Sequence, residues 1–178
     1  MKKAKRTIFS ALVLILLSTQ NVLSDTILSI ESAKQAILNN QIDEGIKLYT
    51  EALSSDSNNI EALYFRGLAY RHKGETAQAL EDLIKVTNLV PELATPYPHI
   101  AQIYMSTANY KEALPYLDKA IEQSPDNDDL YGYRVVCYLE LKEYQKANKD
   151  LTKMYEINPN NEVARRFMEI NARKAQEI

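Results

Sequence analysis

Three prolines, Pro91, Pro125 and Pro159, lie 34 residues apart. This spacing constrains the fold more than any other feature, because self-similarity at a fixed interval of about 20 to 50 residues is the signature of stacked structural repeats. Four further sets keep the same interval: Leu63, Tyr97 and Tyr131; Tyr70, Tyr104 and Tyr138; Ala79, Ala113 and Ala147; and Leu83, Leu117 and Leu151. Five sets in one register predict a chain of repeats, each packed against its neighbours.

The composition favours helices within each repeat. The 178 residues include four glycines and six prolines, so few tight-turn residues are present for β-hairpins. We expect an all-helical fold with two helices, A and B, in each repeat. The small residues Gly67 and Ala101 on helix A, with Ala79 and Ala113 on helix B, would let the two helices approach closely. The prolines would end each helix B.

The segment from Ile60 to Leu93 resembles one unit of the tetratricopeptide repeat (TPR) family. It carries the signature residues of that family in order: Leu63, Gly67, Tyr70, Gly74, Ala79, Leu83 and Pro91. The resemblance covers four units, 26–59, 60–93, 94–127 and 128–161. The first unit is degenerate, because Gly45 stands where Ala is usual and Ser57 where Pro is usual. Arg66 and Arg134 also depart from the family, which usually has Leu there.

The resemblance implies an all-α fold, a solenoid of helix-turn-helix TPR units that forms a right-handed superhelix. Residues 162–178 would close this solenoid as a C-terminal capping helix. The reason is that apolar residues gather on one side of that segment: Val163, Ala164, Phe167, Met168 and Ile170.

The N-terminus has the layout of a secretory signal peptide. Four cations in the first six residues precede an uncharged apolar run from Ile8 to Leu17. This run is too short to span the hydrocarbon core of a membrane stably. We therefore expect a signal peptide over residues 1–24, cleaved after Ser24, and an exported protein that is periplasmic or secreted. The alternative is an uncleaved segment that anchors the protein to a membrane.

Removal of this signal would leave 17 basic and 24 acidic residues, a net charge of −7. Such a charge disfavours nucleic acid and anionic membranes as partners. Cys137 is the only cysteine, so no intramolecular disulfide can form.

The sequence offers no constellation for catalysis, for a metal or for a cofactor. His72 and His99 differ by seven residues in their positions within the repeat, which separates them by about 10 Å along parallel helices. Cys137 lies between apolar residues and is interpreted as a packing residue. Asp126, Asp128 and Asp129 lack the glycine and the final glutamate of a calcium loop, so helix capping explains them better. We expect no enzyme activity.

In TPR proteins the concave groove is lined by positions two, five, nine, twelve and thirteen of each helix A. The resemblance therefore implies a partner-binding groove with apolar and polar members, namely Tyr64, Leu68, Arg71, Pro98, Gln102, Met105, Gly132, Val136 and Leu139. Such a strip suits an amphipathic helix or an extended apolar peptide. Only Lys34 and Arg71 are cations at groove positions, which argues against the TPR subtype that clamps acidic C-terminal tails.

These features predict a non-enzymatic scaffold or adaptor that helps to assemble or maintain an envelope or secreted complex. It would bind a partner polypeptide in the groove as a monomer or weak dimer. A second hypothesis is a secreted effector or structural subunit that associates with itself through the repeat ends. A third is a hydrolase, for which the sequence has no nucleophile, base and orienting group.

Overall fold

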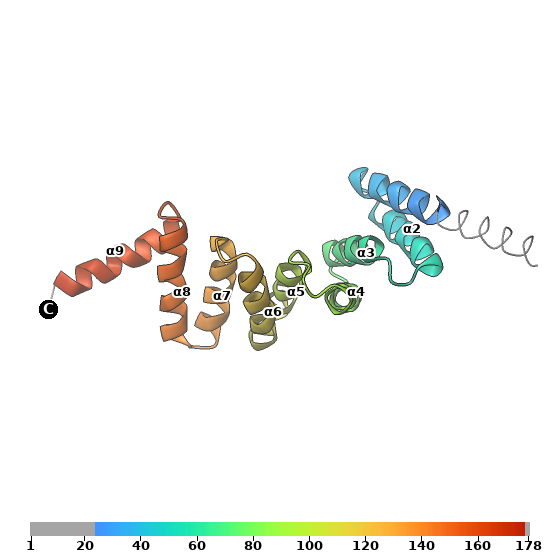
Figure 1. The fold of residues 1–178 in the computed structure, drawn as a ribbon. Helices are drawn as coiled ribbons and strands as arrows, with labels where there is room; N and C mark the ends of the chain where they lie inside the picture. The colour runs from blue at the N-terminus through green and yellow to red at the C-terminus, as the bar shows by residue number, and fades with distance from the viewer. Residues whose placement is uncertain (1–23, 177–178) are drawn as a thin grey trace, which may run out of the picture. The chain divides into compact units, whose positions relative to one another are not determined.

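A computed structural model describes residues 24–176, with side chains as far as residue 170. All regular structure in this part of the chain is helical, which confirms the predicted fold class. The helices are residues 24–38, α2 Ile42–Ser55, α3 Ile60–Lys73, α4 Thr76–Leu89, α5 Pro96–Ser106, α6 Tyr110–Gln123, α7 Asp128–Glu140, α8 Tyr144–Ile157 and α9 Glu162–Gln176 (Figure 1). The predicted signal peptide, apart from Ser24, lies outside the described residues. Among the described helices, none is long and apolar enough to cross a membrane.

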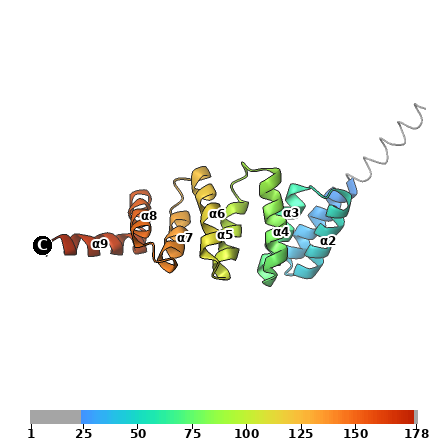
Figure 2. The same cartoon turned by 90° about the horizontal axis from the view of Figure 1, so that it is seen from below.

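The chain divides into two compact units within α4, between Asp82 and Leu83. The first unit contains the helix of residues 24–38, α2, α3 and the start of α4. The second contains the rest of α4 and the helices α5 to α9. Within the second unit each helix from α5 to α8 packs against the next, and α9 packs against α8 (Figure 2).

The prolines and left-handed turns set the helix ends. Helices α4, α6 and α8 each end two residues before Pro91, Pro125 or Pro159. The turns from helix A to helix B each contain one residue with positive φ, again 34 residues apart: Asn40, Gly74, Ala108 and Lys142. A left-handed residue after a helix ends it and frees the chain to reverse direction. The repeat is thus visible in the backbone as well as in the sequence.

Tyrosine hydroxyls tie successive repeats together in the second unit. The Tyr97 hydroxyl donates to the carbonyl of Pro91 at 2.7 Å, and the Tyr131 hydroxyl donates to the carbonyl of Pro125 at 3.1 Å. Both rings are buried, so each supplies apolar packing and satisfies a carbonyl at the inter-repeat turn. This contact explains why Tyr recurs with the proline at this interval.

Small residues lie where helices approach most closely. Ala79, Ala101, Ala113 and Ala147 are completely buried, as the sequence predicts. Gly45 occupies the equivalent place in α2, where a Cβ atom would lie only 2.5 Å from Cδ1 of Ile37. The Ile37 side chain thus fills the space of the missing methyl group, which accounts for glycine at this departure from the family pattern.

The C-terminal helix α9 packs by only part of its predicted apolar side. Ala164 is fully buried against α8, and Phe167 packs on the same cluster. Val163 and Ile170, however, are 63% and 53% exposed. These two side chains stay exposed because, among the described helices, α9 contacts α8.

Candidate binding surfaces

The nine predicted groove residues lie on three helices. Tyr64, Leu68 and Arg71 are on α3 in the first unit. On α5 and α7 of the second unit are Pro98, Gln102, Met105, Gly132, Val136 and Leu139. All nine are accessible: Val136 and Leu139 are 43% and 45% exposed and the others are half-buried. The structure brings the α5 and α7 residues into one unit, where the two helices are in contact.

The first unit contains an apolar cavity of about 530 Å³. This volume falls in the range of about 300 to 1,000 Å³ that is typical of ligand sites. Two predicted groove residues, Leu68 and Arg71, line it. The remaining lining residues come from the helix of residues 24–38, from α2 and from α3: Lys34, Ile37, Leu38, Ile42, Tyr49, Phe65, Ala69 and His72.

Aromatic packing holds one wall of this cavity. The Tyr49 ring is buried and stacks on Phe65 with centroids 6.3 Å apart, and Tyr64 meets Phe65 edge to face at 5.2 Å. Burial raises the pKa of Tyr49 to about 12, so the hydroxyl stays neutral at physiological pH. Among the other lining residues, Leu38 is 76% exposed. The cavity therefore combines a fixed wall with an accessible apolar rim.

Lys34, Arg71 and His72 are the basic residues that line the cavity. Lys34 pairs with Glu31 at 2.7 Å and with Glu61, near the start of α3, at 2.6 Å. The hydrogen bonds that the Lys34 ammonium donates to these two carboxylates raise the pKa of Lys34. Arg71 and His72 lie ten and eleven residues after Glu61, which is about 15 Å further along the helix.

Sequence reasoning missed most of the apolar members of this cavity. Ile37 and Leu38 stand 34 residues before Arg71 and His72, so they occupy groove positions twelve and thirteen of the degenerate first unit. Applying the same groove positions to the first unit, residues 26–59, would have identified Ile37 and Leu38. Phe65 has no such signal, because position six is not a groove position in the family pattern.

In the second unit the two exposed residues of the predicted groove, Val136 and Leu139, are both on α7. Met105 instead packs partly on a buried cluster that includes Ala113, Leu117 and Cys137, so part of its side chain belongs to the core. Gly132 lies against Met154, where an added Cβ atom would be 3.4 Å from Cε. Val136 and Leu139 are therefore the freest apolar side chains of the predicted set on this unit.

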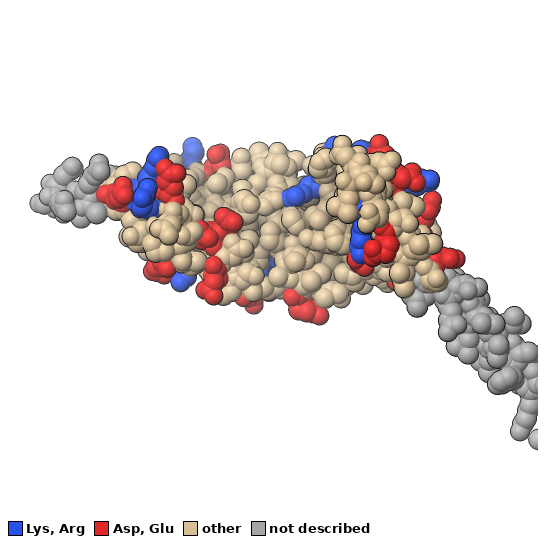
Figure 3. Space-filling model, turned by 90° about the horizontal axis from the view of Figure 1, so that it is seen from above, with Lys and Arg blue, Asp and Glu red and all other residues tan. Residues whose placement is uncertain are grey.

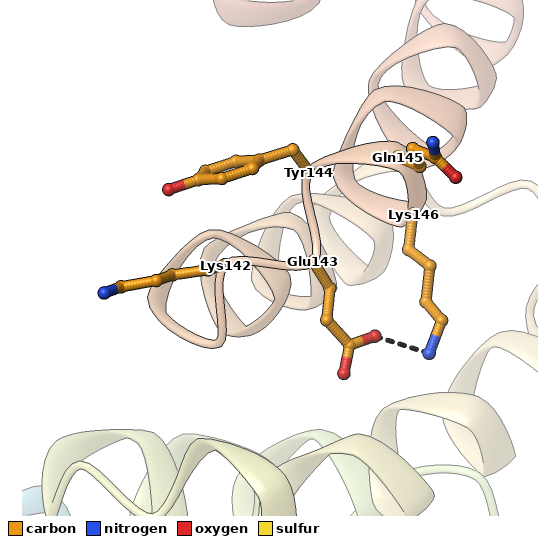
Figure 4. A pocket seen from close by; sticks show the side chains of 5 residues that line it. All are labelled: Lys142, Glu143, Tyr144, Gln145 and Lys146. Carbon is orange, nitrogen blue, oxygen red and sulfur yellow. Dashed lines mark ion pairs between the residues drawn. The ribbon is translucent and has the colours of Figure 1, made fainter.

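A smaller polar hollow of about 420 Å³ lies at the turn between α7 and α8. Lys142 and Tyr144 project to one side of the turn, and Glu143 pairs with Lys146 on another (Figure 4). The Lys146 ammonium also lies 5.3 Å from the centre of the Tyr138 ring. The ion pair with Lys146 thus accounts for the Glu143 carboxylate in this hollow.

The titratable side chains give no catalytic arrangement in the described residues. His72 and His99 belong to different units, and no cluster of metal-binding side chains is present in that part of the chain. Cys137 is fully buried, and burial raises the pKa of its thiol to about 11. On the face shown in Figure 3 the acidic and basic side chains are scattered among uncharged residues, and no continuous basic patch is visible there.

Comparisons with known proteins agree on the repeat. Family models described as tetratricopeptide repeat match residues 33–87 and 104–149. The chain is 30% identical over 115 residues to UDP-N-acetylglucosamine--peptide N-acetylglucosaminyltransferase of Giardia intestinalis, and 30% identical over 127 residues to human Tetratricopeptide repeat protein 13. These matches cover 65% and 68% of the chain. The chain spans only 8% and 15% of the lengths of these two relatives.

A solved structure has the same fold at low sequence identity. A tetratricopeptide repeat protein from Parabacteroides merdae superposes with a TM-score of 0.76 at 18% identity, covering 82% of this chain and 58% of that one. Its fold therefore agrees with the helix pairs and the 34-residue period described above. The chain is a tetratricopeptide repeat protein, with family matches over residues 33–87 and 104–149 and the fold of a TPR solenoid.

Proposed function

We propose that this protein is an exported, non-enzymatic adaptor that binds a partner polypeptide through the groove positions of its A helices and helps to assemble or maintain an envelope or secreted complex. The observation that carries the proposal is the accessibility of apolar side chains at those positions, Leu38 and Leu68 in the first unit and Val136 and Leu139 in the second. Repeat solenoids present extended binding surfaces of this kind. Accessible apolar residues at repeated positions mark surfaces that bind other proteins.

The competing hypothesis is self-association through the repeat ends, with the unusual first unit as the contact. Phe65 and Arg66 of α3 face the preceding helix, because Phe65 stacks on Tyr49 and Arg66 bonds to Thr50. The 34-residue period puts Glu31 and Ser32 at these places in the first described helix, and both are exposed. Ile27 and Leu28, one turn earlier on the same side of that helix, are 55% and 66% exposed, so this face is part polar and part apolar.

Partner capture tests the binding proposal. The double variant Leu68→Glu, Val136→Glu should lose a partner that the wild-type protein captures from an envelope extract, while its helical circular dichroism stays unchanged. Leu89→Glu is the matched control, because Leu89 is also exposed but lies on a B helix. Equal capture by the double variant and the control would refute the groove. Light scattering of the pure protein decides the alternative, since a growing open assembly would favour self-association.

The export proposal rests on the sequence of residues 1–24 and needs its own test. The protein recovered from its native host should begin at Asp25 and should be released by carbonate extraction. Intact chains that resist carbonate would support the anchor instead. This measurement is independent of partner binding.

A further inference from the structure

The cavity of the first unit is lined mainly by hydrocarbon. Apart from Lys34, Arg71 and His72, its lining residues are aliphatic side chains, Phe65 and Tyr49. Sites for small molecules have this kind of lining, mostly apolar and aromatic with a few polar groups. The cavity therefore has the lining, as well as the volume, of a small-molecule site.

The Lys34 ammonium at this cavity is already compensated. It lies 2.7 Å from a carboxylate oxygen of Glu31 and 2.6 Å from one of Glu61. An anionic ligand would have to compete with both carboxylates for this one ammonium. It would therefore lose hydration without gaining a new ion pair here.

The cations near the end of α3 have partners too. The Lys73 ammonium, next to the lining residue His72, lies 2.7 Å from Asp43 and 2.6 Å from Glu75. Arg71 also has an interaction partner. The charges around the cavity thus belong to existing pairs, and the lining offers a ligand chiefly apolar contact.

We propose that this cavity binds a small neutral molecule with a hydrocarbon chain, such as a long-chain alcohol or its ester. This inference goes beyond the proposed adaptor function, because it concerns a second kind of ligand and the first unit alone. A hydrocarbon chain matches the apolar lining without any charge to compensate. An extended polypeptide buried there would instead leave backbone N–H and C=O groups with few partners.

Local packing forms the cavity before a ligand binds. Gly45 allows Ile37 to lie directly against α2, and the Tyr49 ring stacks on Phe65. Side chains held in place before binding lose less conformational entropy when a ligand binds. Leu38 is the most exposed of the apolar lining residues, so it is accessible to an entering chain.

Fluorescence of the neutral dye N-phenyl-1-naphthylamine tests the proposal with the protein recovered from its host. The dye should bind at one site per chain. Decanol should displace it at a concentration at least about threefold lower than decanoate or decyltrimethylammonium, because both ions have a charge that the cavity does not compensate. Displacement by either ion as effective as that by decanol would overturn the neutral class of ligand. Failure of the dye to bind would overturn the site.

Two exposed leucines of the first described helix locate the bound dye. Leu38→Gln should weaken binding about three- to tenfold, because an apolar contact of the lining is lost. Leu28→Gln is the matched control, because Leu28 is 66% exposed on the same helix but does not line the cavity. It should leave the Kd unchanged. Equal effects of the two substitutions would mean that the dye adsorbs to exposed apolar side chains, and the proposal would fail.

A second pair of variants tests the volume of the cavity. Ile42→Trp should fill part of it and weaken the dye at least about tenfold. Thr76→Trp is the control, since Thr76 begins α4 as Ile42 begins α2 but does not line the cavity. Unchanged binding by a folded Ile42→Trp variant would refute the site, and if that variant does not fold the two leucine variants decide. Loss of the site while a partner polypeptide is still captured would leave the adaptor function standing.

Discussion

Arg134 and Asp150 form a two-point ion pair between α7 and α8, with Nε donating to Oδ2 at 2.7 Å and Nη2 donating to Oδ1 at 2.8 Å. Asp150 is only 4% exposed. Arg66 and Asp82 make the same pair 68 residues earlier, with both distances 2.8 Å. The repeat between them has no such pair. Ile100 and Tyr116 occupy the equivalent places, and Tyr116 stacks on Tyr104 at 5.6 Å.

At equivalent repeat positions the chain thus has the buried ion pair in two repeats and an apolar pair in the repeat between them. Exchanging one pair for the other therefore tests how much the ion pair contributes to stability. Arg134→Ile alone should destabilise the protein by about 3 kcal/mol, because it leaves the Asp150 carboxylate buried without its partner. Arg134→Ile combined with Asp150→Tyr copies the middle repeat and should recover most of that loss. Urea unfolding followed by circular dichroism measures both. A double variant as unstable as the single one would show that the neighbouring packing cannot accept the apolar pair.

Thr50 and Asp118 occupy equivalent places beside these two arginines. The Arg66 Nη1 group donates to Thr50 Oγ1 at 3.0 Å, whereas the Arg134 Nη1 group donates to Asp118 Oδ1 at 2.6 Å. Thr50→Asp should therefore add an ion pair to Arg66 and stabilise the first unit by about 0.5 kcal/mol. The gain should shrink in 1 M salt because the pair is exposed.

Thr152→Asp is the matched control for that change. Thr152 has the same place in the repeat as Thr50, and both hydroxyls donate to the carbonyl four residues earlier. The register places Met168, not an arginine, opposite it. Thr152→Asp should give no comparable, salt-sensitive gain. Equal gains in the two variants would show that Arg66 is not the cause.

Much of the fold could be predicted because the residues that recur every 34 positions are those whose type is restricted by helix ends and helix contacts. Prolines cannot continue a helix, and alanines recur where helices touch, so both keep their positions. Arg66 and Arg134 could be recognised as departures from the family, but their partners could not be identified. Each aspartate lies sixteen residues away on another helix, and a buried pair of this kind leaves no periodic signal when the repeat between lacks it.

The candidate site was less predictable for a related reason. The groove register comes from well-formed repeats, whereas the cavity lies largely in the degenerate first unit. There Gly45 replaces a small alanine and lets Ile37 take its space, so packing between particular side chains creates the cavity. In the second unit Met105 fits the groove pattern but also packs against the core. How much of its side chain is buried depends on interatomic distances in the fold, which the spacing of residues in the sequence does not give.

The left-handed turn residues give a prediction about backbone strain. Ala108 has φ of 58°, a conformation that costs roughly 1 to 2 kcal/mol for a residue with a Cβ atom. Ala108→Gly should stabilise the protein by about 0.5 to 1 kcal/mol, after allowance for the greater freedom of glycine in the unfolded chain. Gly74→Ala should destabilise the protein, because Gly74 has φ of 77°, which is unfavourable for a residue with a Cβ atom. No neighbour lies within 4 Å of the place of that Cβ atom, so the loss would come from the backbone conformation and not from a steric clash. Thermal unfolding of both variants checks the signs.

The buried thiol of Cys137 predicts an alkaline loss of stability. Burial raises its pKa from 9.0 to about 11, so the folded state disfavours the thiolate relative to the unfolded state. The contribution is fully present below pH 9 and is lost as the pH rises toward 11, by at most about 1.4 kcal/mol per pH unit. Between pH 8 and 10 the free energy of unfolding should fall less steeply for Cys137→Ala than for wild type. Identical slopes would mean that the thiolate is tolerated in the fold.

Pro115 is the sixth residue of α6, which begins at Tyr110 and continues through the proline to Gln123. Pro115 has no N–H group to donate to the carbonyl of Lys111, and its ring crowds that oxygen, so we expect a bend there. The helix persists because Ala113, Leu117 and Ala120 on its inner side are buried.

Pro115→Ala should therefore stabilise the protein by roughly 2 kcal/mol, since a helix cost of about 3 kcal/mol is relieved and up to about 1 kcal/mol is returned through the freer unfolded chain. Pro98→Ala is the control, because Pro98 lies in the first turn of α5, where backbone N–H groups have no helical acceptor. It should bring no gain. Chemical denaturation measures both variants. If the two substitutions change stability alike, the cost attributed to a proline in the interior of α6 is absent.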